Sequence, residues 1–331
     1  MTSTEKSVLD MSNTNLTDYQ DCLEISLPKD ILAVPSMMSP NERKFLYGFT
    51  RDHFKGDGII IDAGIFMGAS TYIFGKAIQE NPVFPKLDFG NQPPIISFDR
   101  AVIYPNFYPF AKRHKIDVEG LEPGDSFKHL IEKNIAPVVS QVDLRIGDII
   151  EEDYSQIGLP IEMLFLDIIK RPDINDYTIK TWFPYLIPGK SIVVQQDFFC
   201  EGVPHVPVSM EYFAEYFDYL GEIHSASIYR YKKRIPDEEL QRNLNDELSL
   251  EQQLSLIDQA KERTGFTSRK YVLDITKVML AKVKAGNGSE IANSLLSNTE
   301  QQYPALVDEK SSSARLYRAY RSAKSAVTAF Q

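Results

Sequence analysis

The stretch from Ile59 to Thr71 constrains the fold of this chain more than any other. An apolar run ends in a carboxylate at Asp62, the chain then turns through Gly64 and Gly68, and a helix-favouring segment begins directly afterwards. This order predicts a strand, a tight loop and a helix start. In open α/β sheets that arrangement receives a ligand at the carboxyl edge of the strands.

The carboxylate of Asp62 limits which ligand this loop suits. A pyrophosphate about 4 Å away would be repelled by about 4 kcal/mol at an effective dielectric constant near 20. A ligand with an ammonium group would be attracted instead. S-adenosylmethionine carries an α-amino group and a sulfonium and has no phosphate, so the loop favours it over NAD. The alternative is an ordinary βα turn, because two glycines after an apolar strand also occur without a ligand.

Composition excludes several classes of partner. The 331 residues have a formal net charge of −10, which argues against nucleic acid as a partner because phosphate binding needs clustered basic residues. Cys22 and Cys200, the only cysteines, lie far apart and show neither metal-type spacing nor a disulfide framework, as suits a reducing compartment. No signal core or membrane-length apolar run occurs. We therefore expect a soluble cytoplasmic protein without a membrane partner.

Further predicted strands follow the first and alternate with helical segments. They cover residues 95–99, 142–146, 161–167 and 191–195. Near-continuous apolar strands alternating with helices predict an α/β fold with a doubly wound, mostly parallel Rossmann-like sheet. Acidic residues recur at or just after the strand ends: Asp62, Asp99, Asp148, Asp167 and Asp197. Ligands bind at this edge of such sheets.

The remaining segments define a predicted domain organisation. Residues 1–38 read as a polar, partly disordered leader, residues 39–235 as the ligand-binding domain, and residues 236–331 as a helical C-terminal extension without a catalytic motif. Ser39, Pro40 and Glu42 predict a capping box with a helix running towards Gly56. Residues 104–124 are aromatic and irregular, as in a surface loop or lid. An aromatic helix predicted over 206–220 suits a core or a contact between copies, so homo-oligomer formation is open.

With the acidic strand ends in place, residues 39–232 resemble the class I S-adenosylmethionine-dependent methyltransferases. The resemblance is strongest to the macrocin O-methyltransferase type, which occurs with natural-product and glycan pathways. It implies that Gly147 and Asp148 lie at the adenine edge and that Asp99 binds the ribose hydroxyls. Asp99 and Asp148 could each instead be a cap or turn residue. The resemblance further implies that the methionine portion of the cofactor is held by Asp62, Gly64, Gly68, Ser70 and Thr71.

On the acceptor side the chain is similar to metal-dependent small-molecule O-methyltransferases. Asp167 ends the fourth predicted strand, Lys170 follows three residues later, and Gln196 and Asp197 follow the fifth strand. The similarity implies Mg²⁺ held by Asp167, Gln196 and Asp197, because Mg²⁺ prefers oxygen ligands. Such an ion would acidify the acceptor hydroxyl, and Lys170 would take its proton.

Two departures from that pattern weigh against a metal. Gln196 stands where such enzymes commonly carry an acid, and Arg171 adds positive charge beside Lys170. Lys170 could alternatively form a salt bridge with Asp167 or Asp173. His205, predicted in the loop after the fifth strand, is a rival base because its ordinary pKa suits proton transfer at neutral pH. A lone loop histidine is also often only a surface residue.

We therefore predict an S-adenosylmethionine-dependent methyltransferase that acts on a hydroxyl of a sugar, glycoside or similar small polar acceptor. Lys170, Asp167 and His205 are its candidate catalytic residues. Two other classes stay open. One is a binding or scaffold protein that kept the fold without turnover. The other is a nucleotide-linked oxidoreductase, against which Asp62 is the main argument.

Overall fold

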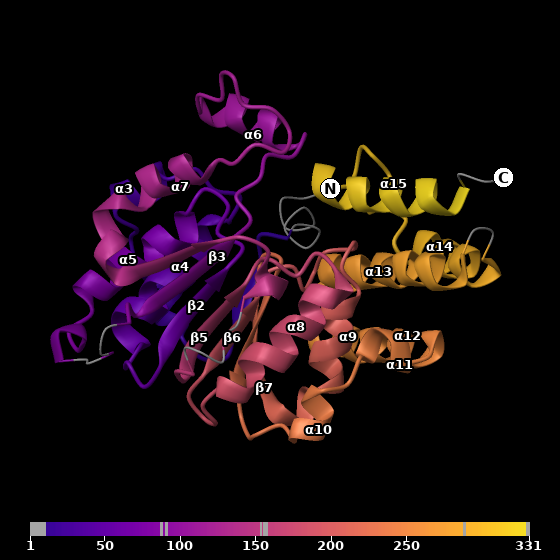
Figure 1. The fold of residues 1–331 in the computed structure, drawn as a ribbon. Helices are drawn as coiled ribbons and strands as arrows, with labels where there is room; N and C mark the ends of the chain where they lie inside the picture. The colour runs from indigo at the N-terminus through magenta and orange to yellow at the C-terminus, as the bar shows by residue number, and fades with distance from the viewer. Residues whose placement is uncertain are drawn as a thin grey trace. The chain divides into compact units, whose positions relative to one another are not determined.

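The computed structural model describes residues 11–86, 89, 92–152, 154, 158–286 and 289–328. The first ten residues of the expected leader and the last three of the expected extension lie outside this part. The chain is a mixed α/β protein that divides into two compact units (Figure 1). The N-terminal unit comprises Asp18–Ile168 and Tyr185–Ile187, and the C-terminal unit comprises the segments up to Thr17, Ile169–Pro184 and the chain from Pro188. Within the described residues, no helix is both long and apolar enough to span a membrane.

The N-terminal unit is built on four parallel strands. They are β2 (Ile59–Ala63), β3 (Ile95–Asp99), β4 (Val142–Ile146) and β5 (Ile161–Leu166). Their spatial order is β5-β2-β3-β4. Every residue of β2 and β5 is buried, as expected for parallel strands covered on both faces. From β2 the chain moves outward to β3 and β4 and then returns to the other side of β2. The predicted doubly wound, mostly parallel α/β class is confirmed.

The helix before β2 begins as predicted and ends differently. The Ser39 backbone N–H donates to the Glu42 carboxylate at 2.6 Å, and the Glu42 N–H donates to Ser39 Oγ at 3.3 Å, which confirms the capping box. The helix α4 ends at Gly48 and continues as the π-helix η1 rather than as a regular helix towards Gly56. The helices of this unit are α2 (Asp21–Glu24), α3 (Lys29–Ala33), α4 (Pro40–Gly48), η1 (Phe49–His53), α5 (Ala69–Glu80), α6 (Phe107–His114) and α7 (Lys128–Ile135).

A buried glutamate fixes the entry to β2. Glu162, 3% exposed, accepts the backbone N–H groups of Lys55 at 2.6 Å, Asp57 at 2.6 Å and Gly58 at 3.4 Å. A Cβ at Gly58 would lie 2.5 Å from the carbonyl oxygen of Pro160, so only glycine allows this approach. The loop that delivers β2 to the sheet is therefore tied to the start of β5.

The C-terminal unit contains four antiparallel strands. They are β1 (Thr14–Leu16), β6 (Ile192–Gln195), β7 (Phe217–Ile223) and β8 (Ala226–Tyr231), in the order β1-β7-β8-β6. The described part of the expected leader thus contributes a paired strand. A Cβ at Gly221 would lie 1.9 Å from the Asn15 carbonyl oxygen, so this glycine lets β1 reach β7.

Two element predictions were wrong. The helix predicted over 206–220 is α9 (His205–Tyr212), and the chain turns into β7 at Phe217. The aromatic residues of 217–223 alternate with polar ones, a strand pattern that the aromatic richness of the segment obscured. The region 104–124 is not wholly irregular, since it contains α6. Phe107 and Phe110 of α6 are buried against Phe66, so these aromatics anchor the helix.

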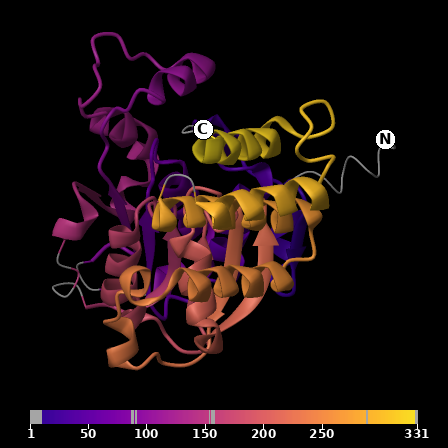
Figure 2. The same cartoon turned by 90° about the vertical axis from the view of Figure 1, so that its right-hand side faces the viewer.

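Helices make up most of the remaining C-terminal unit. The long helix α13 packs between α12 and α15, and the last four helices appear as orange and yellow layers (Figures 1 and 2). The helices of this unit are α8 (Pro172–Trp182), α9, α10 (Asp237–Leu240), α11 (Leu244–Glu247), α12 (Leu250–Arg263), α13 (Thr267–Ala285), α14 (Glu290–Gln302) and α15 (Ala314–Thr328). Among the described residues, short 3₁₀ turns are η2 (Phe84–Lys86), η3 (Ala136–Gln141), η4 (Ile149–Glu151), η6 (Phe183–Tyr185) and η7 (Ala214–Tyr216). The domain boundaries after residues 38 and 235 stay predictions.

A buried ion pair connects α13 to β7. Arg269 and Glu222 are 0% and 1% exposed at their side chains, and their charged atoms lie 3.1 Å apart. The guanidinium also donates to the carbonyl oxygen of His224 at 3.1 Å and to that of Asn13 beside β1. Thr264 donates to the same glutamate at 2.9 Å. This network joins one helix to two neighbouring strands.

Candidate active site

Asp62 lies fully buried near the carboxyl end of β2. Its Oδ2 accepts the hydroxyl of Thr71 from α5 at 2.6 Å and that of Ser97 from β3 at 3.5 Å. The two hydroxyls lie 3.0 Å from each other. The carboxylate is therefore positioned by side chains from the next helix and the next strand.

The other oxygen of Asp62 has no such support. Oδ1 is buried and has no hydrogen-bond partner among the described residues. Burial raises the pKa of Asp62 to about 7, although the hydroxyls of Thr71, Ser70 and Ser97 act in the opposite direction. A buried carboxylate with one unsatisfied oxygen gains most from a hydrogen-bonding cation.

The loop after β2 uses its two glycines as the sequence predicted. Gly64 and Gly68 have φ values of +90° and +81°, which side chains rarely adopt. A Cβ at Gly64 would lie 2.5 Å from the backbone of Asp167, and one at Gly68 would lie 2.7 Å from Ile135. Phe66, between them, also has a positive φ of 49°. The loop therefore packs tightly against the ends of β2 and β5, and only glycine fits at these two positions.

The helix α5 begins at this loop without a side-chain cap. Gly68 is its N-cap and, having no side chain, makes no cap hydrogen bond to the first turn. The first N–H groups of a helix have no intrahelical partner and carry partial positive charge. Ser70 is 3% exposed, and Thr71 is engaged with Asp62. The helix start therefore suits an anionic group such as a carboxylate.

A small pocket opens between the loop and the segment before α4. Its volume is about 30 Å³, close to that of one water molecule. Among the described residues that line it, Asp167 is the only charged side chain. The other lining residues are Pro35, Ser36, Met37, Met38, Gly64, Ile65, Phe66, Met67, Ala69, Ser70 and Phe165. The pocket lies where the strand order reverses beside β2, the usual ligand position in doubly wound sheets.

Asp99 lies at the end of β3 and holds the glycine loop. Its Oδ2 accepts the Phe66 N–H and its Oδ1 accepts the Ala101 N–H, both at 2.7 Å. Both donor residues have positive φ, 49° for Phe66 and 51° for Ala101, so the carboxylate supports two strained turns. Burial raises the pKa of Asp99. The structure thus places Asp99 against the loop, while its predicted role at the ribose stays a prediction.

Asp148 follows β4 and caps a short turn. Its Oδ1 accepts the Ile150 N–H at 3.2 Å, and its Oδ2 lies 3.9 Å from Arg100. The preceding Gly147 donates its N–H to the Asp99 carbonyl oxygen at 3.0 Å. The cap role weighed for Asp148 is present, and a role at the adenine stays a prediction.

The acceptor-side residues divide between the units. Asp167 belongs to the N-terminal unit, and Lys170, Gln196 and Asp197 belong to the C-terminal unit. Lys170 forms an ion pair with Asp197, a partner that the sequence analysis did not consider. Arg171 instead pairs with Asp173 at 2.6 Å. Gln196 is 7% exposed. A metal ion that binds Asp197 would therefore have to displace the ammonium of Lys170.

His205 is the first residue of α9 rather than part of a loop. It is 8% exposed, and its Nε2 lies 3.4 Å from the carbonyl oxygen of Ile169. Burial lowers the pKa of His205 to about 4. The imidazole is therefore neutral at physiological pH and has one nitrogen available as a proton acceptor. It is a buried histidine and not the surface residue considered as the alternative.

Three contributors to the site are not among the residues predicted from the sequence. Ser97 completes the hydroxyl pair on Asp62, Phe66 occupies the strained loop position, and the segment Pro35–Met38 lines the pocket. Ser97 follows Asp62 by 35 residues along the chain. Ser97 lies on β3 directly beside Asp62 of β2, and this register position is the signal that could have identified it.

Comparison with known proteins gives little further guidance. No protein-family model and no curated protein matches the chain. The structure of the O-methyltransferase NovP is 12% identical, with a TM-score of 0.43, over 60% of this chain and 83% of that one. A crystal structure of a candidate O-methyltransferase from Klebsiella pneumoniae is 15% identical, with a TM-score of 0.37, over 64% and 89% of the two chains. Both similarities are too low to support a conclusion on fold or activity.

Proposed function

We propose that this protein is an S-adenosylmethionine-dependent methyltransferase that modifies a hydroxyl of a sugar, glycoside or similar small polar molecule. The observation that carries the proposal is the pairing of a buried, partly unsatisfied carboxylate with an uncapped helix start at the point where the sheet order reverses. That pairing suits a ligand bearing an ammonium and a carboxylate on neighbouring atoms.

The residues fit an amino-acid group better than a phosphate. The carboxylate of such a ligand would meet the N–H groups at the start of α5, and its ammonium would meet Asp62 Oδ1. Asp167 is the acid that lines the pocket, Asp62 lies buried beneath the same loop, and no basic side chain is among the described lining residues. A pyrophosphate would face these acids without a compensating cation.

Room for the cofactor requires the covering segment to move. The pocket of about 30 Å³ admits one water molecule. S-adenosylmethionine is much larger, so its binding requires Pro35–Met38 to move aside. Met37 in that segment is 73% exposed, and methionine side chains adapt readily to new surroundings. Met38, Phe66 and Phe165 then offer apolar and aromatic surface to the cofactor.

The cofactor supplies an electrophilic methyl group on its sulfonium, so the protein has to orient the acceptor and receive a proton. Two groups are candidates for the proton. One is the Asp197 carboxylate, which forms an ion pair with Lys170. The other is the neutral imidazole of His205. To act as a base, Lys170 would first have to lose the proton with which its ammonium pairs with Asp197. Mg²⁺ at Asp167, Gln196 and Asp197 stays a hypothesis, and no step here is routed through it.

Calorimetric titration of the full chain with S-adenosylmethionine, S-adenosylhomocysteine and NAD tests the proposal. We expect binding of the first two and weaker binding of NAD. Transfer of a labelled methyl group to a panel of glycosides should then follow, and addition of a chelator reports whether a metal takes part. Cofactor binding without transfer to any acceptor would favour the scaffold alternative. Tighter binding of NAD would overturn the proposal in favour of an oxidoreductase.

A further inference from the structure

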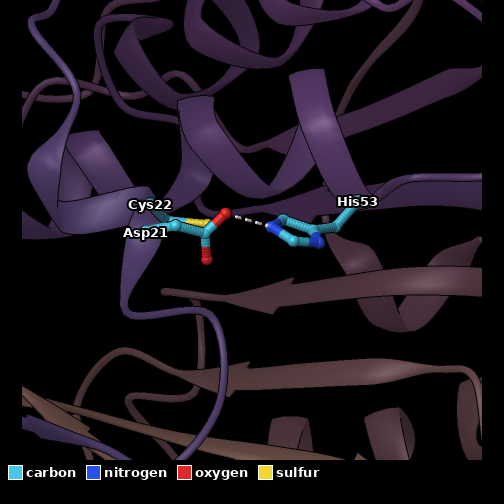
Figure 3. A group of neighbouring side chains, drawn as sticks. All are labelled: Asp21, Cys22 and His53. Carbon is cyan, nitrogen blue, oxygen red and sulfur yellow. Dashed lines mark hydrogen bonds and ion pairs between the residues drawn. The ribbon is translucent and has the colours of Figure 1, made fainter.

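A second group of reactive side chains lies outside the candidate active site, in the N-terminal unit. Asp21 and Cys22 begin α2, and His53 ends η1 (Figure 3). One ligand atom from each of the three lies within 4.8 Å of those of the other two. We propose that these residues form a zinc-binding site that fastens α2 to η1.

The donor set fits zinc. A thiolate, an imidazole and a carboxylate are all common ligands of Zn²⁺, and their mixture of sulfur, nitrogen and oxygen suits this borderline-soft ion better than Mg²⁺ or Ca²⁺. With a thiolate, a carboxylate and a neutral imidazole, the bound ion would be electrically balanced. The side chain of Asp21 is 59% exposed, so a water molecule can reach the fourth position.

The distance between the imidazole and the carboxylate is shorter than in a zinc site. Zinc bonds of about 2.0–2.3 Å in a tetrahedron place neighbouring ligand atoms roughly 3.2–3.8 Å apart. Here Nε2 of His53 lies 2.7 Å from Oδ2 of Asp21 in a hydrogen bond, shown dashed in Figure 3. The exposed carboxylate can rotate away by about 1 Å to admit the ion. The buried thiol is already held in place, since Cys22 is 1% exposed.

The surrounding structure brings the two helical segments together at this point. A Cβ at Gly48 of α4 would lie 2.8 Å from Cys22 Cα, so glycine permits the close approach of α2. The Phe54 N–H donates to the Phe49 carbonyl oxygen at 2.9 Å and closes the wide turn that carries His53. π-Turns of this kind are rare and are frequent at functional sites.

Neighbouring rings and charges complete the site. The imidazole of His53 packs against Tyr19 and Phe49 with centroids 4.9 and 6.1 Å away, which restricts its orientation. The charged side chains of Asp52 and Arg51 also act on Cys22, which is a free cysteine in this structure. Zinc binding forms the Zn–S, Zn–N and Zn–O bonds and releases the thiol proton to solvent.

Cobalt substitution tests the site in the full-length chain after treatment with a chelator. We expect one equivalent of Co²⁺ to bind with a thiolate-to-metal charge-transfer band, which one equivalent of Zn²⁺ then abolishes. Cys22→Ala should remove the band. His53→Gln and Asp21→Asn should each weaken binding by about 10-fold or more, by comparison with the loss of an outer-shell partner. Zinc should raise the melting temperature of the unaltered protein and not that of Cys22→Ala.

Matched controls use residues of the same types elsewhere. Cys200→Ala removes the only other cysteine, and His129→Gln changes an exposed histidine, so both variants should keep the band and the affinity. Circular dichroism establishes that each variant is folded. Because Asp21 is exposed, Asp21→Asn remains informative if Cys22→Ala fails to fold. Absence of the band, its loss in Cys200→Ala, or unchanged affinity in both His53→Gln and Asp21→Asn would overturn the proposal.

Discussion

Asp62 couples ligand binding to protonation. Its pKa of about 7 means that much of the protein carries a neutral carboxyl group in the acid range, whereas a bound ammonium needs the carboxylate. Binding of S-adenosylmethionine should therefore tighten by more than about 10-fold between pH 5 and pH 7, because the ionised fraction rises tenfold for each pH unit below the pKa. Calorimetry across this range measures the change. In Asp62→Asn, binding should be weak and nearly independent of pH.

The stability of the ligand-free protein should change with pH in the opposite direction to the affinity for S-adenosylmethionine. A carboxyl group whose folded pKa lies above its unfolded value binds protons more readily when folded. The contribution of Asp62 to the free energy of unfolding therefore falls as pH rises from about 4 to about 7, and Asp62→Asn removes this fall. Glu251→Gln, an exposed acid on α12, serves as the control and should leave both pH profiles unchanged. Identical affinity of the unaltered protein at pH 5 and pH 7 would contradict the role of Asp62.

Among the elements, the ion pair between α13 and β7 makes the largest single contribution that we predict. Arg269→Met leaves Glu222 charged and buried, which should lower the free energy of unfolding by about 3–5 kcal/mol. Urea unfolding followed by the fluorescence of Trp182, the only tryptophan and a buried residue of the same unit, measures it.

Two further variants serve as controls for the Arg269→Met measurement. Lys233→Met breaks a solvent-exposed pair with Glu215 and should change the free energy of unfolding far less than Arg269→Met does. Adding Glu222→Gln to Arg269→Met removes the buried charge and should restore part of the loss. A loss below about 1 kcal/mol for Arg269→Met alone would show that the pair contributes little.

Elements were predictable from the sequence where a clear start or stop signal marked their ends. The strand 142–146 matches β4 because Gly147 ends it, and Ser39 with Glu42 marked the start of α4. The boundary between α9 and β7 was missed because aromatic residues pack equally well in both, and the pairing partners that decide between them are distant.

The same distinction applies to the sites. Asp62, Gly64 and Gly68 were identifiable because their strand, turn and helix are consecutive. The partner of Lys170 was not, because Asp197 follows it by 27 residues and the pairing depends on how the chain folds back. The proposed zinc ligands were not predicted for a similar reason. Cys22 and His53 come from different helical segments, and their separation along the chain matches no metal-binding spacing.

For the whole molecule, a ligand that binds only the folded state should raise the unfolding temperature. S-adenosylmethionine at 100 times its dissociation constant should add about 2.7 kcal/mol to the free energy of unfolding. Scanning calorimetry with S-adenosylmethionine, and with NAD at the same concentration, measures the difference. A larger shift with NAD would contradict the proposed cofactor.

The strand β1 imposes an order on the assembly of the chain. Thr17, just after β1, donates its hydroxyl to the Leu220 carbonyl oxygen, 203 residues further along. During synthesis the ribosome must therefore add about two hundred residues before β1 can meet β7, and the Arg269 side chain that contacts Asn13 emerges later still. Contacts so distant in sequence form slowly because a long loop has to close first. A nascent chain that pauses before Phe217 leaves β1 without its partner strand, and at that stage it is a natural substrate for chaperones.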